Sequence, residues 1–446
     1  MWRTVKQKIL ANNALVKRYG LLVTTDLCGK ALGLVVAKIA VQRFGADGFG
    51  IIGVTLTWVS YALLVGNFGL DSYAVKTAAK RQESIGTLGG TLITMELLFG
   101  VAIYAILILV ALCVPSLRPH LALISIFGLS LITVALTLNW VPLALERSNI
   151  TGYVGLAVQA TNLLLLVLLL QRSNHLWTFA AAKVSAEVMG AAVLLIWTIQ
   201  VVGPIKRPLP VAQWWGILRH SAPIGGAMIF RTVSLTCDLA LLGIFTAESW
   251  RHLRWPAHVD LAQIGQYNGA IKVFGLYLTL GSLYFMVLFP RLAKISNQGM
   301  VPLKKAADES LAVVTLGAVG GAGILAIAAP LVLKILYVPS FAAAANPLRI
   351  LLCAGIANQM SKHFRQTLFL VGRQKVDLKL SAVAAGAHVV LKLALIPFLG
   401  VIGCALGMLL GEALLAGLAW RAVRKAFTEV AGSEELETTC LTAAEP

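Results

Sequence analysis

Apolar segments long enough to cross a lipid bilayer recur about twelve times along this chain of 446 residues. A membrane-spanning helix needs roughly 20 mainly apolar residues, because the hydrocarbon core is about 30 Å thick. Hydrophobic residues make up 58% of the sequence and charged residues 13%, which excludes an ordinary soluble domain. The sequence therefore predicts an all-α polytopic membrane protein with about 12 transmembrane helices. The predicted spans are residues 19–41, 50–68, 88–113, 120–145, 151–170, 176–201, 217–246, 267–289, 307–336, 346–371, 376–397 and 400–424.

Basic residues near the ends of these spans gather on one side of the membrane. If the N-terminus is cytoplasmic, roughly 22 of them lie on the cytoplasmic side, where membrane proteins carry their excess of Lys and Arg. The outer side holds Arg43, Arg118, Arg172, Arg251 and Arg254. The sequence therefore predicts that both termini are cytoplasmic. This topology accounts for much of the net charge of +18, and without a soluble basic face no nucleic-acid partner is expected.

A Pro-rich and basic segment, Gly203 to Pro210, is typical of a linker between two halves. The predicted parts are a cytoplasmic N-terminus (1–18), an N-lobe of six helices (19–202), a cytoplasmic linker (203–216), a C-lobe of six helices (217–427) and a disordered acidic tail (428–446). Lys30 and Arg231 lie near the middle of the first spans of the two lobes. Related halves with a site near the midplane are typical of alternating-access transporters.

Charged residues inside the predicted spans are more often basic than acidic. Charges that face lipid are costly, so such groups face water, a partner or a ligand. The acids are Asp26, Glu96, Glu187, Asp238 and Glu412. The cations are Lys30, Lys38, Lys183, Arg231, Lys272, Lys334, Arg349, Lys362, Arg365 and Lys392. Even with every acid paired, the interior is predicted to be net positive.

Several of these charges also have a purely structural interpretation. Lys334, Arg349 and Lys392 lie near span ends, where their side chains can extend to the headgroups. Three pairs can neutralise each other on one helix face because of their spacing: Asp26 with Lys30, Lys183 with Glu187, and Arg231 with Asp238.

Lys30 and Arg231 are the main candidates for binding an anion, because their depth makes extension to the headgroups difficult. Lys38, Lys272, Lys362, Arg365 and Lys183 complete the candidate set. Phosphate or pyrophosphate suits such a series, since Arg offers two parallel hydrogen bonds and Lys a point charge. Neither the scattered cysteines nor the histidines have metal-ligand spacing, so no metal or cofactor is expected.

Two other kinds of protein stay open on the residues alone. A membrane-embedded glycan polymerase, ligase or lipid-dependent glycosyltransferase would need an outer loop with catalytic groups, and the longest predicted loop, Ala247 to Ile264, is polar. A multidrug cation antiporter would need an acidic cavity, which the excess of cations disfavours. A scaffold without transport does not explain charges at the midplane.

Six segments in order resemble the Wzx-type polysaccharide flippases of the multidrug/oligosaccharidyl-lipid/polysaccharide (MOP) exporter superfamily. Three lie in the first seven spans: Phe44-Gly-Ala-Asp-Gly-Phe-Gly50, Gly66-Asn-Phe-Gly-Leu-Asp-Ser-Tyr-Ala-Val-Lys76 and Cys237-Asp-Leu-Ala-Leu-Leu-Gly243. Three follow: Gly265-Gln-Tyr-Asn-Gly-Ala-Ile-Lys-Val273, Leu288-Phe-Pro-Arg-Leu-Ala-Lys294 and Leu370-Val-Gly-Arg-Gln-Lys375. The resemblance covers the chain to about residue 425.

The resemblance implies two six-helix lobes around a central cationic cavity in the bacterial inner membrane. The implied substrate is an undecaprenyl-pyrophosphate-linked oligosaccharide repeat unit for O-antigen, capsule or exopolysaccharide, with its polyprenyl tail in the lipid. It implies no covalent chemistry. It also implies H⁺ or Na⁺ as a coupling ion, for which Asp26, Asp238 and Glu187 are candidates, and polysaccharide polymerase machinery as a partner.

Overall fold

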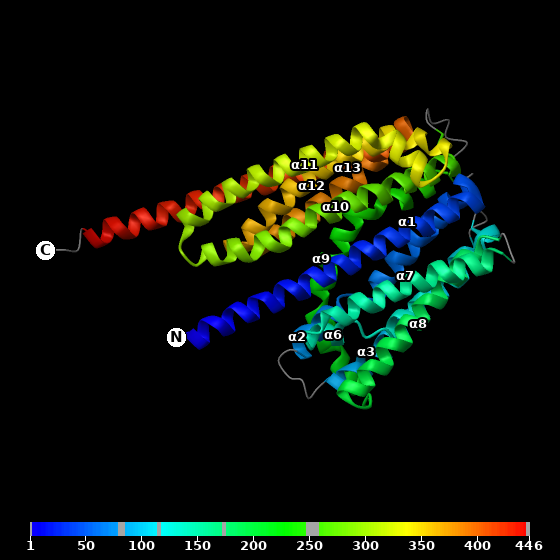
Figure 1. Ribbon diagram of the computed structural model, residues 1–446, viewed down its shortest axis with the longest axis horizontal. Coiled ribbons are helices and arrows are strands. Elements are labelled where there is room, and N and C mark those ends of the chain that lie inside the picture. Colours follow the sequence, from blue (N-terminus) through cyan, green and yellow to red (C-terminus); the bar gives the residue numbers. More distant parts are fainter. Residues whose placement is uncertain (1, 79–84, 114–116, 172–174, 247–257, 443–446) are drawn as a thin grey trace. The chain divides into compact units, whose positions relative to one another are not determined.

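The computed structural model describes residues 2–78, 85–113, 117–171, 175–246 and 258–442, and all regular structure in these ranges is helical (Figure 1). The first elements are α1 (Trp2–Asn67), α2 (Leu70–Ala78), α3 (Ile85–Cys113), η2 (Arg118–His120), α4 (Leu121–Gly128), α5 (Ser130–Ala135), α6 (Trp140–Ala144), α7 (Ser148–Leu170) and α8 (Trp177–Val202). The others are α9 (Val211–Phe245), α10 (Leu261–Ser296), α11 (Met300–Leu336), η4 (Pro339–Ala344), α12 (Ala345–Leu370) and α13 (Gln374–Thr442). The predicted all-α class is confirmed.

Two glycines divide the longest helices into separate membrane crossings. The described residues contain 10 helical segments long and apolar enough to span a bilayer, and the first and last of these are far longer than one crossing needs. Gly45 interrupts α1 with φ 70°, and Gly400 interrupts α13 with φ 57°. Positive φ is readily adopted only by glycine, so each residue permits a turn between two helices. Divided there, the segments agree with the prediction of about 12.

The chain separates into two compact units, Met1–Ile229 and Phe230–Pro446. They are called unit 1 and unit 2 below, and each is described by itself. The division falls inside α9, a continuous helix from Val211 to Phe245. The lobe boundaries and the linker at 203–216 remain a prediction. The acidic tail from residue 428 likewise remains a prediction.

Unit 1 is built on neighbouring long helices. Helix α1 packs on α7, and α7 packs on α8, so these helices lie side by side (Figure 1). A core cluster joins α2, α3 and α6 to the first part of α9 through Leu70, Leu92, Trp140 and Ile217. Asn67 lies at the edge of this region and donates its amide to Glu96 at 2.8 Å, which gives this buried acid a polar partner.

Two glycines in unit 1 let the end of the second span touch α9. A Cβ atom on Gly225 would lie 2.4 Å from the carbonyl oxygen of Phe68, and one on Gly69 would lie 2.7 Å from the Gly225 nitrogen. Gly69 also has φ +80°, which disfavours other residues. The contact therefore requires glycine on both sides.

The fourth predicted span, residues 120–145, is not one helix. It is divided into α4, α5 and α6, and Leu138 between α5 and α6 has φ 39°. Pro142 lies in α6 and cannot donate the hydrogen bond that a continuous helix needs at this position, which favours a new helix start before it. The division still places Ser130 at the start of α5, where its hydroxyl donates to Glu187 of α8 at 2.5 Å.

Unit 2 is a bundle of closely packed helices in which α12 contacts α13, α11 and α10 (Figure 1). The two parts of α13 on either side of Gly400 form a hairpin through glycines spaced by four residues. Cβ atoms on Gly403, Gly407 and Gly411 would lie 2.3, 2.6 and 2.4 Å from Leu395, Lys392 and His388. Small residues at this spacing let membrane helices approach closely. The packing leaves no room for side chains at these three positions.

Candidate functional site

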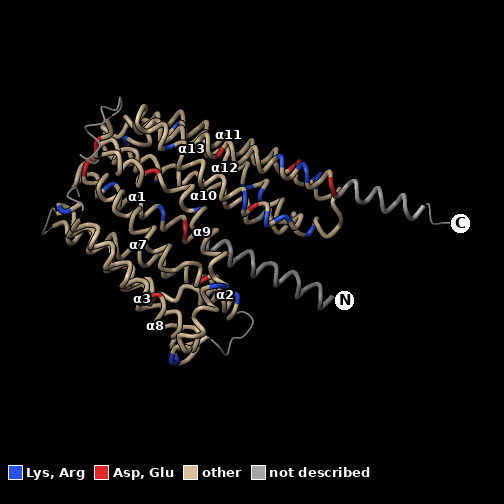
Figure 2. The backbone as a smooth tube through the Cα atoms, turned by 180° about the vertical axis from the view of Figure 1, so that it is seen from behind, with Lys and Arg blue, Asp and Glu red and all other residues tan. Residues whose placement is uncertain are grey.

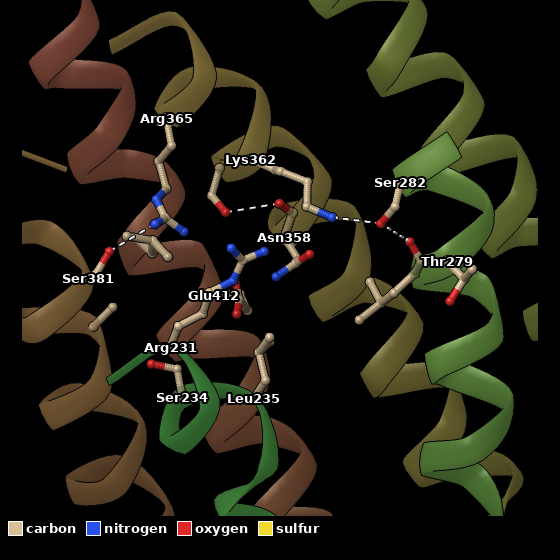
Figure 3. A pocket seen from close by; sticks show the side chains of 14 residues that line it. Arg231, Ser234, Leu235, Thr279, Ser282, Asn358, Lys362, Arg365, Ser381 and Glu412 are labelled. Carbon is tan, nitrogen blue, oxygen red and sulfur yellow. Dashed lines mark hydrogen bonds between the residues drawn. The ribbon is translucent and has the colours of Figure 1, made fainter. Parts of the chain in front are cut away.

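A cavity of about 210 Å³ lies within unit 2 and is surrounded by α9, α10, α12 and α13 (Figure 3). Most of its lining side chains are polar, although the four helices carry few charged residues along most of their length (Figure 2). Arg231, Ser234, Leu235, Leu278, Thr279, Ser282, Asn358, Ser361, Lys362, Arg365, Ser381, Ala384, Glu412 and Leu415 form the lining. Three of these residues are basic and one is acidic, so the cavity is net positive when all four are ionised.

Four of the lining residues come from one face of α12. Asn358, Ser361, Lys362 and Arg365 are separated by three, four and seven positions from the first, which is the spacing of a single helix face. The amino group of Lys362 donates to the Ser282 hydroxyl at 2.8 Å and lies 5.6 Å from the centre of the Phe285 ring. These contacts hold a half-buried cation at the wall of the cavity.

Arg365 is already engaged by an acid. Its guanidinium forms two bonds to Asp377, one from Nε and one from Nη2 at 3.2 Å, and Nη2 also donates to Ser381 at 2.9 Å. Asp377 lies in the first turn of α13, where the helix dipole favours a negative charge. Much of the positive charge of Arg365 is therefore balanced within the protein.

Arg231 differs, because no hydrogen bond or ion pair joins its side chain to any residue that the structure describes. Figure 3 shows its guanidinium group among the lining side chains, close to Asn358 and Glu412. The five N–H donors of a guanidinium suit a planar or tetrahedral oxyanion. Arg231 is thus the cation in this cavity that is best placed to receive an anion.

Asp238, seven residues after Arg231 on α9, binds Lys392 instead. Its Oδ1 atom pairs with the Lys392 amino group, and its Oδ2 atom accepts from the Tyr267 hydroxyl at 2.6 Å. Lys392 also contacts the Cys237 sulfur at 3.3 Å. The interpretation that Arg231 and Asp238 form a bridge is therefore wrong. So is the expectation that Lys392 extends to the headgroups, because this side chain is fully buried beside an acid that satisfies its charge.

The remaining candidate residues are distributed elsewhere. Lys30 pairs with Asp26 at 2.8 Å, and both side chains are about half exposed. Lys183 pairs with Glu187, which also accepts from Ser130. These residues and the half-buried Lys38 belong to unit 1.

The cavity therefore brings together three of the seven cations predicted to bind substrate. Lys272 belongs to unit 2 but does not line the cavity, whereas Arg231, Lys362 and Arg365 do. Sequence reasoning missed Ser282 and Asn358 as lining residues. The spacing of Asn358 on the polar face of α12 could have indicated its position, whereas the place of Ser282 depends on how α10 and α12 pack.

No group of three or more His, Cys, Asp and Glu side chains arranged to hold a metal occurs among the described residues. The lining of the cavity offers guanidinium, ammonium, carboxylate, amide and hydroxyl groups. Such groups bind anions and sugar hydroxyls through charge and hydrogen bonds.

Solved structures of membrane transporters share this fold at low sequence identity. An inward-facing multidrug resistance MATE family transporter of the MOP superfamily is 13% identical, with a TM-score of 0.72 over 92% of this chain and 96% of the other. The lipid II flippase MurJ in an inward closed conformation is 12% identical, with a TM-score of 0.69 over 96% and 93%. The Vibrio cholerae MATE transporter VcmN, as a mutant, is 17% identical, with a TM-score of 0.60 over 94% and 98%. No curated protein sequence matches the chain.

These helices define a multi-pass membrane protein that shares its fold with the MATE and MurJ transporters. The model of the polysaccharide biosynthesis protein family matches residues 15–296, which is more than half of the chain. The chain belongs to that family. The resemblance that its sequence motifs carry is thereby confirmed.

Proposed function

We propose that this protein is a flippase that moves polyprenyl-pyrophosphate-linked oligosaccharide repeat units across the bacterial inner membrane by alternating access. The observation that carries the proposal is the cavity in unit 2, where Arg231, Lys362 and Arg365 meet. Membership of the polysaccharide biosynthesis family supports a glycan precursor as the cargo. The product would serve O-antigen, capsule or exopolysaccharide synthesis, with polymerase machinery as the acceptor.

In this proposal the cavity binds the pyrophosphate group of the carrier lipid. Arg231 offers a guanidinium that no described residue pairs, and Lys362 adds an ammonium group held by Ser282. Arg365 contributes less charge, because Asp377 already binds it. The Asn358 amide is placed to hydrogen-bond phosphate or sugar oxygens, and the Ser361 hydroxyl, which donates to the Asn358 carbonyl, can accept from a sugar hydroxyl. The polyprenyl tail stays in the lipid, where its burial costs nothing.

In the same proposal, the route by which the anion crosses the membrane is lined by the cations of unit 1 and by Lys272. Lys30 and Lys38 lie on α1 eight residues apart, and Lys30 shares its charge with Asp26. Lys183 is the weakest member, since Glu187 balances it. Asp26, Asp238 and Glu187 are the candidates for binding a coupling ion in this proposal, and each of them has a lysine partner.

Two rival functions are less well supported. A multidrug cation antiporter would need a cavity that attracts cations, and this cavity contains three basic residues and one acid. A membrane-embedded polymerase or ligase would need catalytic groups in the outer loop from Ala247 to Ile264, of which residues 247–257 lie outside the described ranges. The transporter fold favours a flippase over both an enzyme and a scaffold.

Flipping in proteoliposomes tests the proposal. A fluorescent polyprenyl-pyrophosphate oligosaccharide is incorporated in both leaflets, and its outward movement is followed by the accessibility of the sugar to a membrane-impermeant reagent. Hydrogen bonds to charged groups contribute roughly 1.5–3 kcal/mol, so Arg231→Ala is expected to slow flipping about ten- to hundred-fold. Arg231→Lys should retain more activity than Arg231→Ala, because it keeps the charge.

The matched control is Lys334→Ala, which removes an exposed cation of α11 outside the cavity. It is expected to flip at the rate of the unchanged protein. If all variants flip alike, the cavity cations are structural and the proposed site is wrong. If the unchanged protein lengthens or cleaves the sugar instead of moving it, the enzyme alternative replaces the flippase.

A further inference from the structure

Glu412 is unusual among the intramembrane acids because one of its oxygens has no hydrogen-bond partner among the described residues. Its side chain is 1% exposed, and its Oε2 atom is the one without a partner. The other four acids each have a partner: Asp26 has Lys30, Glu96 has Asn67, Glu187 has Lys183 and Ser130, and Asp238 has Lys392 and Tyr267. A buried carboxylate that has an oxygen without a hydrogen-bond partner destabilises the fold unless it binds a proton or a cation.

His388 is the neighbour of this carboxylate, and it also lacks hydrogen-bond partners. It is fully buried, and neither ring nitrogen forms a hydrogen bond with a described residue. Its Nε2 atom lies 3.5 Å from the Glu412 Oε1 atom. The ring occupies the space above Gly411, where a Cβ atom would lie 2.4 Å from Nδ1. Two buried titratable groups thus face each other with capacity for a shared proton between them.

Glu412 also faces the cations of the cavity. Arg231 of α9 and Lys362 of α12 both interact electrostatically with this carboxylate. Arg365 of α12 lines the same cavity together with its partner Asp377 of α13, whereas α10 contributes Leu278, Thr279 and Ser282, which carry no charge. Without an anion in the cavity, the ionised carboxylate is attracted to Arg231 and Lys362, although it forms no ion pair with either of them.

An anion that enters the cavity competes with Glu412 for these cations. The ionised carboxylate would repel the anion, and it would also lose its attraction to the two cations once the anion binds them. Uptake of one proton removes both penalties, because a neutral carboxyl group neither repels the anion nor needs a cation, and its O–H can donate to His388. We infer that Glu412 and His388 form a proton-binding site that is linked to anion binding in the cavity.

A proton fits this site better than a sodium ion. Hard metal cations prefer several oxygen ligands, whereas Glu412 and His388 together offer one carboxylate beside an imidazole. An imidazole nitrogen accepts a proton readily. The inference rests on the proposed function, since it assumes that the cavity receives a pyrophosphate group.

Calorimetric titration of the purified full-length protein in lipid nanodiscs with inorganic pyrophosphate tests this linkage. Titrations at one pH in two buffers of different ionisation heat give the number of protons taken up for each anion bound. The unchanged protein is expected to take up as much as one proton more than Glu412→Gln. Pyrophosphate's own ionisation contributes equally to both titrations, so it cancels when the proton numbers of the two proteins are subtracted.

The pH dependence gives a second measurement. Relative to Glu412→Gln, the unchanged protein should bind pyrophosphate more weakly as pH rises, by up to about tenfold for each pH unit. Glu412→Gln carries a permanently neutral side chain and should keep the tight binding of low pH throughout. The matched control is Glu309→Gln on the exposed face of α11, which should behave like the unchanged protein. His388→Asn should shift the pH at which affinity changes, and it provides a second variant if Glu412→Gln does not fold.

The outcomes separate this inference from the proposed function. If pyrophosphate binding depends on Arg231 but Glu412→Gln takes up as many protons as the unchanged protein, the proton site is wrong and the anion cavity stands. If affinity follows sodium concentration rather than pH, and loses that dependence in Glu412→Gln, the bound ion is sodium and the inference is overturned. If Arg231→Ala binds pyrophosphate normally, both the proposed cavity and its proton linkage fail.

Discussion

Lys392 and Asp238 form an ion pair in the interior of unit 2, although they are 154 residues apart in the sequence. The pair joins α9 to the first part of α13, and Tyr267 adds α10 through its hydrogen bond to Asp238. Both side chains are almost fully buried. The aliphatic part of Lys392 lies over Gly407, so the same residue also contributes to the hairpin within α13.

Breaking this pair should destabilise the protein strongly. Lys392→Met keeps the length of the side chain but leaves the Asp238 carboxylate buried without its cation, at an expected cost of roughly 3–5 kcal/mol. The double variant Lys392→Met with Asp238→Asn removes both charges and should recover much of this loss. Unfolding followed in detergent micelles measures both, with Lys334→Met as the exposed control. Equal destabilisation by the single and double variants would contradict the importance of the pairing.

Two adjacent glycines of α9 should respond in opposite directions to the same substitution. In Gly225→Ala, the new methyl group meets the Phe68 carbonyl, and we expect a loss of roughly 1–3 kcal/mol. In Gly226→Ala, nothing lies within 4 Å of the new atom, so the substitution should be neutral or stabilise the helix by up to about 1 kcal/mol. Thermal unfolding midpoints distinguish the two. A similar loss of stability in both variants would show that the contact between Gly225 and Phe68 is not the cause of the destabilisation.

Release of Arg365 should strengthen anion binding. Asp377→Asn removes one negative charge beside the cavity and weakens the hold on the Arg365 guanidinium. We expect pyrophosphate to bind roughly two- to ten-fold more tightly, because one repulsive charge is removed while three cations remain. Isothermal titration at fixed ionic strength measures the change, with Asp308→Asn on the exposed face of α11 as control. Weaker binding would indicate that Asp377 holds Arg365 in the orientation that the anion needs.

The stability of unit 1 should depend on the pH through Asp71. Burial raises the pKa of this carboxyl group above its ordinary value of 3.8, against a smaller opposite effect of a hydrogen bond from Asn67. The folded protein then retains a proton that the unfolded chain has released, so stability falls as pH rises from about 4 through the raised pKa. Asp71→Asn should reduce this dependence. The difference in unfolding midpoint between the two proteins, measured across pH, should grow as pH rises; a constant difference would rule out the protonated acid.

Hydropathy and glycine placement were sufficient to predict the helical class and most of the spans. The turn containing Gly45 was apparent because glycines separate two apolar segments there, and the boundary near Gly400 follows from the length of a single crossing. The break at Leu138 was not predictable by the same reasoning, because the residues from 120 to 145 are apolar on both sides of it. The local backbone geometry at Leu138, rather than the composition of the segment, determines where this helix break occurs.

The candidate site was only partly predictable, because a sequence shows which charges share a helix but not which helices share a cavity. Lys362 and Arg365 were identifiable as a pair on one face of α12. The partner of Lys392 was not, since it depends on how α9 packs against α13. Glu412 was recognised as an intramembrane acid, yet its isolation beside His388 is visible only in three dimensions.

The hairpin within α13 also determines how this region can vary. Gly403, Gly407 and Gly411 each lie against an atom of the preceding helix, two of them against residues that carry the buried ion pair and the proposed proton site. A saturation library would therefore show three positions, four residues apart, that reject even alanine, whereas Gly417 on the same helix has open space and should accept many residues. In the second part of α13, substitutions should therefore be tolerated mainly on the faces that do not carry these three glycines.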